Sequence, residues 1–168
     1  MTPPRRPVLY ISGPYTPGNG RTTEDNIDIA RAHAATAWER GWAAFCPHLN
    51  TAGFEHLCEG MSWEDWIAGD LAILDLLDPT TDAVLMLPGW EESRGATVER
   101  QRAITRGLEV FDPLVYPRCI PRPEARGRGV CPHYRPVHYE IDDQDTCSAT
   151  VSPRCPPGMS CPIRRRCR

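Results

Sequence analysis

One carboxylate in the middle of the chain falls among apolar residues. If residues 63–77 form a helix, Asp70 lies on its apolar face, close to Trp66 and Ile67. A carboxylate on an inward face is costly unless it is paired or lines a cleft. Asp70 is therefore either satisfied by a helix N-terminus or an arginine, or it is placed there to do chemistry.

Glu99 has the same property in a second helical stretch. Over residues 93–106, Ala96, Glu99 and Ala103 share one face, and the two alanines would let the helix lie close to a sheet. The alternative is an ion pair between Glu99 and a neighbouring arginine such as Arg100. Two carboxylates in one cleft suit cleavage of a glycosidic bond, because one attacks or stabilises the sugar carbon while the other protonates the leaving group.

A candidate anion site precedes Glu99. Ser93 is placed to cap the helix, and its hydroxyl, the free backbone N–H groups behind it and the helix dipole would together attract an anion. Gly95 would let a ligand approach the backbone closely. The alternative is that Ser93 only caps the helix. With Glu99 six residues further on, one site would have a phosphate end and a nucleophile end.

The elements that must position these residues alternate between strands and helices. We expect strands at 8–12, 42–46, 82–87 and 109–111, and helices at 23–40, 63–77 and 93–106. This order is typical of an α/β fold with a parallel sheet. Ligands of such sheets bind beyond the carboxyl ends of the strands. The corresponding loops here are 12–22, 46–61 and 88–95.

Composition divides the 168 residues into an acidic body and a basic tail. Residues 1–112 carry a net charge of −8, whereas residues 113–168 carry +5 and hold 10 of the 18 prolines and 6 of the 8 cysteines. We expect one α/β domain over 1–112 and an irregular Pro/Arg/Cys-rich tail over 113–168. The acidic body argues against nucleic acid as its main ligand, although the arginine-rich end of the tail could contact it weakly.

The tail carries possible metal ligands. A structural zinc site could form from Cys119, Cys131, His133 and Cys147, and the alternative is a disordered extension with incidental thiols. We expect no cofactor for catalysis. The longest apolar runs are too short for a signal peptide or a membrane-spanning helix, so we expect a cytoplasmic protein without a membrane partner.

Several motifs, taken together and in order, resemble the nucleoside 2-deoxyribosyltransferase-like superfamily. The resemblance spans residues 8–111 and leaves out the tail. The matching pieces are Tyr10-Ile11-Ser12-Gly13-Pro14-Tyr15, Asn26, Gly69-Asp70-Leu71, Leu87-Pro88-Gly89-Trp90-Glu91, and Ser93 through Gly95 to Glu99.

The resemblance implies a flavodoxin-like sheet between helices and a role for three residues. Glu99 matches the nucleophile that attacks the anomeric carbon, Asp70 the acid that protonates the leaving base, and Tyr10 the tyrosine that orients the nucleophile. The segment Gly13-Pro14-Tyr15 matches the first nucleotide-binding loop. The resemblance also implies a homo-oligomer.

The position of Ser93 separates two branches of that superfamily. The transferases carry an Asp there, which contacts the sugar 5'-hydroxyl, and the monophosphate glycosidases carry a Ser, which contacts the 5'-phosphate. Ser93, followed by Arg94, therefore favours an N-glycosidase of nucleoside 5'-monophosphates. The first loop departs from the glycosidase pattern because it lacks a serine and an arginine at 13–15, so phosphate would meet Arg21 or Arg94 instead. The alternatives are a deoxyribosyltransferase and a non-catalytic nucleotide-binding or interaction module.

Overall fold

The computed structural model describes residues 4–18, 20–111, 117 and 120–126. Within them, no helix has the length and apolar character needed to cross a membrane. The tail residues expected to bind zinc, Cys119, Cys131, His133 and Cys147, lie outside the described residues.

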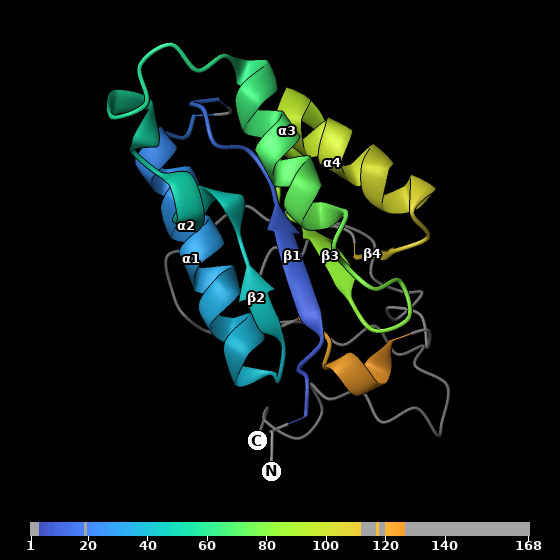
Figure 1. Cartoon of the computed structure of the whole chain (residues 1–168). Coiled ribbons are helices and arrows are strands. Elements are labelled where there is room, and N and C mark those ends of the chain that lie inside the picture. Colours follow the sequence, from blue (N-terminus) through green and yellow to red (C-terminus); the bar gives the residue numbers. More distant parts are fainter. Residues whose placement is uncertain (1–3, 19, 112–116, 118–119, 127–168) are drawn as a thin grey trace, which may run out of the picture. The chain divides into compact units, whose positions relative to one another are not determined.

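A parallel sheet of four strands forms the centre of the domain, in the order β2-β1-β3-β4 (Figure 1). The strands are β1 (Val8–Ser12), β2 (Ala43–Phe45), β3 (Ala83–Met86) and β4 (Glu109–Phe111). The order is that of the first four strands of a flavodoxin-like sheet, as expected. Its direction reverses at β1, so the pair β1 and β3 marks the point where such sheets bind ligands.

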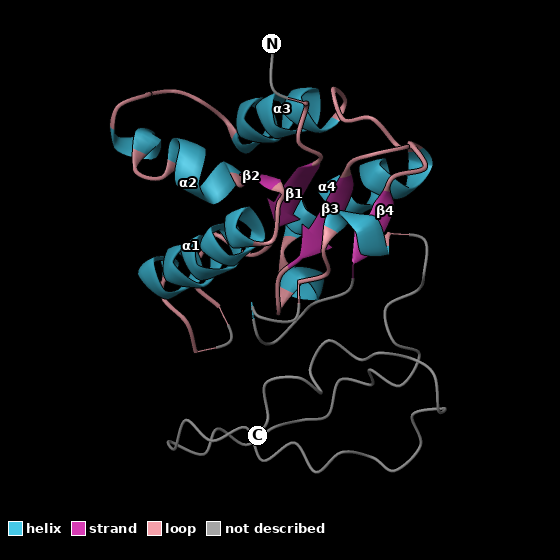
Figure 2. Cartoon of the chain, turned by 90° about the horizontal axis from the view of Figure 1, so that it is seen from below, coloured by secondary structure: helices cyan, strands magenta, loops and turns pink. Residues whose placement is uncertain are grey.

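Helices cover both faces of the sheet. They are α1 (Thr23–Glu39), α2 (Pro47–Thr51), α3 (Trp63–Leu74) and α4 (Arg94–Thr105). Helix α1 lies over one face of the sheet, and α3 and α4 lie over the other (Figure 2). Alanines of α1 pack with Leu9 and Ile11, whereas residues of α3 and α4 pack with Tyr10 and Val84. Because both faces are covered, the strands are mostly apolar rather than alternating with polar residues, and the polar exceptions are Ser12 at the end of β1 and Glu109 at the start of β4.

Side-chain caps define where the long helices begin. Thr22 and Asp25 form a reciprocal capping box at the start of α1, and Ser62 and Asp65 form one at the start of α3. Helix α2 is not expected from the sequence, because Pro47 directly follows the strand expected over 42–46 and falls in the loop expected over 46–61. A proline is equally suited to the first position of a helix, and Pro47 occupies that position.

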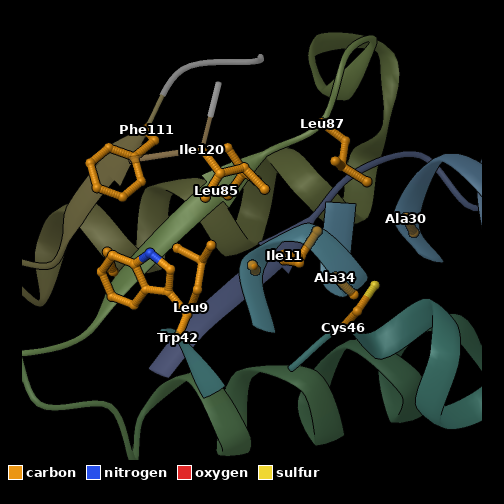
Figure 3. Close-up of a cluster of buried hydrophobic side chains, with 12 residues drawn as sticks. Leu9, Ile11, Ala30, Ala34, Trp42, Cys46, Leu85, Leu87, Phe111 and Ile120 are labelled. Atoms are coloured by element: carbon orange, nitrogen blue, oxygen red, sulfur yellow. The ribbon is translucent and has the colours of Figure 1, made fainter. Parts of the chain in front are cut away.

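The packed part of the chain extends beyond the boundary expected at residue 112. Ile120 is fully buried in the cluster on the α1 face, next to Phe111 and Trp42 (Figure 3). The Trp42 indole N–H donates to the Pro121 carbonyl at 2.7 Å, and the Arg126 guanidinium donates to Glu109 at 3.0 Å. Residues 120–126 therefore pack as part of the α/β domain.

Candidate active site

Glu99 lies on the buried face of α4, as its spacing predicted. The buried residues of that helix are Ala96, Glu99 and Ala103. Tyr10 donates a hydrogen bond to Glu99 Oε1 at 2.6 Å, and the Ser12 hydroxyl donates to Oε2. Tyr10 and Ser12 are two residues apart on β1, so their side chains point to the same face of the sheet. The carboxylate is therefore held at the carboxyl end of β1, where the strand order reverses.

No cation neutralises Glu99 within the described residues. Three arginines of α4 and its end could have paired with it. Arg102 and Arg106 instead approach Asp75 at 3.7 and 3.5 Å, and Arg100 lies over the Trp90 ring, 4.7 Å from its centre. Burial raises the pKa of Glu99 to about 7, because the hydrogen bonds from Ser12 and Tyr10 only partly offset the loss of water. This carboxyl group consequently titrates near neutral pH, and the alternative of an ion-paired surface glutamate is wrong.

Asp70, on α3, lies beside Tyr10 and Glu99. Its backbone carbonyl is 3.5 Å from the Tyr10 hydroxyl, and its charge contributes to raising the pKa of Glu99. The Asp70 carboxylate is half-buried and, in the described part of the chain, receives no hydrogen bond or ion pair. Burial raises the pKa of Asp70 to about 6. The structure thus brings together the two carboxylates that the sequence singled out, and neither has a counterion there.

The apolar face of α3 is less deeply buried than expected. Leu74 is the one fully buried residue of the helix, and Trp66 and Ile67 are half-buried. Leu76, just past the end of the helix, is 78% exposed. The reason is that α3 packs mainly against α4, so that only its last turn reaches the core next to the sheet.

The first loop is fixed by contacts within the protein. A Cβ atom on Gly13 would lie 2.6 Å from Leu87 Cβ, so only glycine allows this close approach of the ends of β1 and β3. The Pro14 carbonyl accepts a hydrogen bond from His48 Nε2 at 2.6 Å. The Tyr15 hydroxyl donates to Glu55 at 2.9 Å, which ties the first loop to the loop before α3.

Three residues that support this region were given no role from the sequence. Ser12 and Asn26 lie among the motifs that carry the resemblance, and a role for Ser12 could have been found from its position two residues after Tyr10 on the same strand. Asn26 donates from its amide to the Tyr15 and Thr16 carbonyls, and the signal for it was a polar residue on the buried face of α1. His48 gave no usable signal, because α2 was not predicted.

A hollow of about 160 Å³ lies between the first loop and the N-terminus of α4. Ser93 lines it and caps the helix, since its hydroxyl oxygen accepts from the Ala96 N–H at 3.3 Å. Arg21 also lines it and donates to the Pro88 carbonyl at 3.0 Å. The lining residues are Pro14, Thr16, Pro17, Gly18, Arg21, Asn26, Gly89, Glu92 and Ser93.

Arg94 is placed elsewhere. Its guanidinium lies 3.6 Å from the centre of the Trp63 ring and 3.5 Å from Glu64, at the start of α3. Of the two arginines expected to bind phosphate, Arg21 is therefore the one that lines the hollow together with Ser93. A Cβ atom on Gly95 would meet only Ile67 and Ser93, at 3.9 and 4.0 Å, so the space above this glycine is open.

A metal centre is not apparent in the part of the chain that is described, which contains no group of three or more His, Cys, Asp or Glu side chains that could hold an ion. A family model named Domain of unknown function (DUF4406) matches residues 7–112, a range that includes Tyr10, Asp70, Ser93 and Glu99. No curated protein matches the chain.

Proposed function

The chain belongs to the DUF4406 family, a domain of unknown function, and we propose from its site that it is an N-glycosidase that hydrolyses the base–sugar bond of a nucleoside 5'-monophosphate. One observation carries the proposal. Glu99 is a buried carboxylate with two neutral hydroxyl donors and, among the residues that the structure describes, no cation, and it lies beside a second, half-buried carboxyl group, Asp70. Burying a carboxyl group in this way costs stability, and a glycosidase needs such a pair.

In the first half of the reaction, a carboxylate oxygen of Glu99 attacks the anomeric carbon of the sugar. The bond from that carbon to the base nitrogen breaks, and its electron pair leaves with the base. Asp70 donates a proton to the departing base, and its pKa of about 6 keeps it protonated more often than an ordinary aspartic acid. The product is a covalent glycosyl ester on Glu99.

Water completes the cycle. The Asp70 carboxylate takes a proton from a water molecule as that water attacks the anomeric carbon. The ester bond breaks, its electron pair returns to Glu99, and the sugar phosphate is released. Tyr10 and Ser12 hold the Glu99 carboxylate throughout. All the steps use side chains of this chain, so we propose that catalysis needs no cofactor.

The hollow beside Ser93 supports a 5'-phosphate on the substrate. It lies at the N-terminus of α4, where backbone N–H groups and the helix dipole favour an anion. The Ser93 hydroxyl already accepts from Ala96 but can still donate, and the Arg21 guanidinium has further N–H groups beyond the one that contacts Pro88. Gly13, Pro14 and Tyr15 would form the wall of the nucleotide site.

We also propose that the protein is a cytoplasmic homo-oligomer. Ile73 and Leu76, on and just after α3, are 38% and 78% exposed, which supports burial of this helix against a second copy. The described cysteines, Cys46 and Cys58, are both free thiols, as is usual in a reducing compartment. Light scattering on the purified protein would measure the mass of the assembly.

The deciding experiment is incubation of the full chain with a panel of nucleosides and nucleoside 5'-monophosphates, followed by chromatography of the products. We expect free base and sugar phosphate from a monophosphate, with none from Glu99→Gln. A second arm adds a different free base. Capture of the sugar by that base, with free nucleosides preferred, would replace the proposal by a deoxyribosyltransferase. Tight nucleotide binding without any product would replace it by a binding module.

A further inference from the structure

Ser12 has one hydrogen-bonding partner for its proton within the described residues, and that partner is Glu99. The side chain is fully buried at the end of β1, and its hydroxyl donates to Oε2 of the Glu99 carboxylate. Buried hydroxyl groups are normally satisfied by the backbone, so a contact committed to a buried carboxylate is unusual for a strand residue. Ser12 lies within the matching motif at residues 10–15, but no role was assigned to it from the sequence.

The Tyr10 hydroxyl has a second acceptor nearby in addition to Glu99. Its hydroxyl donates to Glu99 Oε1 at 2.6 Å, but the same oxygen is also 3.5 Å from the Asp70 carbonyl. A hydroxyl has one proton, so the two acceptors compete for it. The contact from Ser12 has no such competitor, and it holds the second oxygen of the carboxylate against the strand.

We propose that Ser12 is a positioning residue for the nucleophile, because its hydroxyl fixes the rotation of the Glu99 carboxylate and stabilises its ionised form. This inference rests on the proposed function. With Oε1 held by Tyr10 and Oε2 held by Ser12, the carboxylate plane is fixed by two donors from one strand. Each oxygen keeps a further lone pair, so attack on a sugar carbon remains possible.

The charges around Glu99 decide the direction of the effect. The groups that face it are Tyr10 on β1, Asp70 on α3 and the Cys46 thiol after β2. Asp70 raises the pKa of Glu99, and the hydrogen bonds from Ser12 and Tyr10 lower it. Removing the Ser12 hydroxyl leaves Oε2 without its donor, so the ionised form of Glu99 becomes less favourable.

The direct test is a titration of the Glu99 carboxyl group by carbon NMR, with its signal identified as the one missing in Glu99→Gln. In Ser12→Ala we expect the Glu99 titration midpoint to rise by about one pH unit. Ser12→Thr, which keeps a hydroxyl, should titrate like the wild type. Thr105→Ala removes a hydroxyl at the far end of the same helix, bonded only to the Gln101 carbonyl, and should also titrate like the wild type.

Activity gives the second measurement. A nucleophile must be ionised, so a higher pKa of Glu99 lowers kcat/KM most at acidic pH. For Ser12→Ala relative to wild type, the loss at pH 6 should exceed the loss at pH 9 by roughly tenfold. A merely structural role for Ser12 would reduce activity equally at both values.

The two proposals can fail separately. If Ser12→Ala folds and Glu99 titrates at the wild-type pH, the role of Ser12 is overturned whether or not the protein is active. An equal loss of activity at pH 6 and pH 9 would overturn it as well. If the wild type cleaves no nucleotide, the proposed function is overturned, and a shifted titration would still support the hold of Ser12 on Glu99.

Discussion

Two buried carboxylates lie at opposite ends of the same sheet, and their surroundings differ. Asp82 precedes β3 at the amino end and is fully buried. Its oxygens accept two hydrogen bonds from the Arg5 guanidinium, at 2.6 and 3.0 Å, and two from the backbone N–H groups of Val8 and Asp78, both at 2.8 Å. Glu99, at the carboxyl end, has two hydroxyl donors and, within the described residues, no cation.

The pKa values of the two groups move in opposite directions for this reason. Burial alone would raise the pKa of Asp82, but the hydrogen bonds from Arg5 and the backbone outweigh burial and hold it below its ordinary value. Burial of Glu99 is only partly offset by the hydrogen bonds from Ser12 and Tyr10, and its pKa rises to about 7. Asp82 therefore stabilises the fold as an anion, whereas Glu99 as an anion destabilises it. A buried carboxyl group with a raised pKa at the carboxyl end of a parallel sheet is typical of functional sites, which supports the proposed role of Glu99.

The largest expected effect tests the proposed role of Glu99 as the nucleophile. Glu99→Gln keeps the shape of the side chain but cannot attack a sugar carbon, so kcat should fall by about 10³-fold or more. Nucleotide binding, measured by calorimetry, should change much less. The matched variant Asp82→Asn should keep wild-type kcat per folded molecule. Turnover by Glu99→Gln near the wild-type rate would remove the proposed mechanism.

Asp82→Asn tests how much the Asp82 carboxylate stabilises the fold. An amide cannot accept the bidentate contact from Arg5 and the two backbone donors together, so the free energy of unfolding at pH 7 should fall by about 3 kcal/mol. We expect the lower end of the range for a broken buried pair, because the Arg5 side chain is 55% exposed. The difference from wild type should shrink below about pH 4, where the aspartate of the unfolded chain is protonated. Denaturant titrations at pH 7 and pH 3.5 measure both values.

Asp70 is the carboxyl group that must be protonated when the substrate binds and that then donates this proton to the departing base. Asp70→Asn should lower kcat/KM by about 10²-fold for a natural base and much less for an activated leaving group that departs without a proton. Because the pKa of Asp70 is about 6, wild-type kcat/KM should decline as the pH rises above neutrality. That decline should disappear in Asp70→Asn. Equal losses on both substrates would assign Asp70 a positioning role instead.

The raised pKa of Glu99 also predicts how the stability of the protein depends on pH. Glu99 binds a proton more tightly in the folded chain, with a pKa of about 7, than in the unfolded chain, where a glutamate has about 4.3. Wild-type stability therefore falls as the pH rises from about 4.3 to 7, and Glu99→Gln does not share this loss. At pH 8 the variant should be more stable by about 3 to 4 kcal/mol, and at pH 4 the two proteins should unfold nearly alike. A destabilised Glu99→Gln at pH 8 would contradict the contrast with Asp82.

The elements around Glu99, at the carboxyl end of the sheet, could largely be predicted because they depend on local periodicity. The bounds of β1 were predicted as observed, and the buried face of α4 follows from the spacing of Ala96, Glu99 and Ala103. Tertiary contacts decided the rest. Arg94 was expected near phosphate from its place in the chain, yet it lies over Trp63, a contact that no spacing encodes.

The contacts of Asp82, at the amino end of the sheet, and the end of the domain were harder to predict from the sequence. Asp82 was interpreted only as the start of a strand, because its partner Arg5 is far away in the chain and no period connects them. The domain end was placed at 112 because the segment after it is rich in proline and arginine. Ile120 is nevertheless buried under Trp42 and Phe111, since one apolar side chain among prolines is enough to fill a gap in a core.

The smallest expected effect concerns Ser93, at the edge of the reactive end. Ser93→Asp keeps a good helix cap but places a negative charge in the hollow beside Arg21. For a nucleoside 5'-monophosphate, kcat/KM should fall by about tenfold, because a charge-assisted contact is replaced by repulsion, whereas the parent nucleoside should be cleaved no more slowly. Gln101→Glu adds the same charge on the exposed face of α4 and should alter neither value. If both substrates lose activity equally in Ser93→Asp, the hollow does not bind the phosphate, and the reactive end would consist of Glu99 and Asp70 without a phosphate subsite at Ser93.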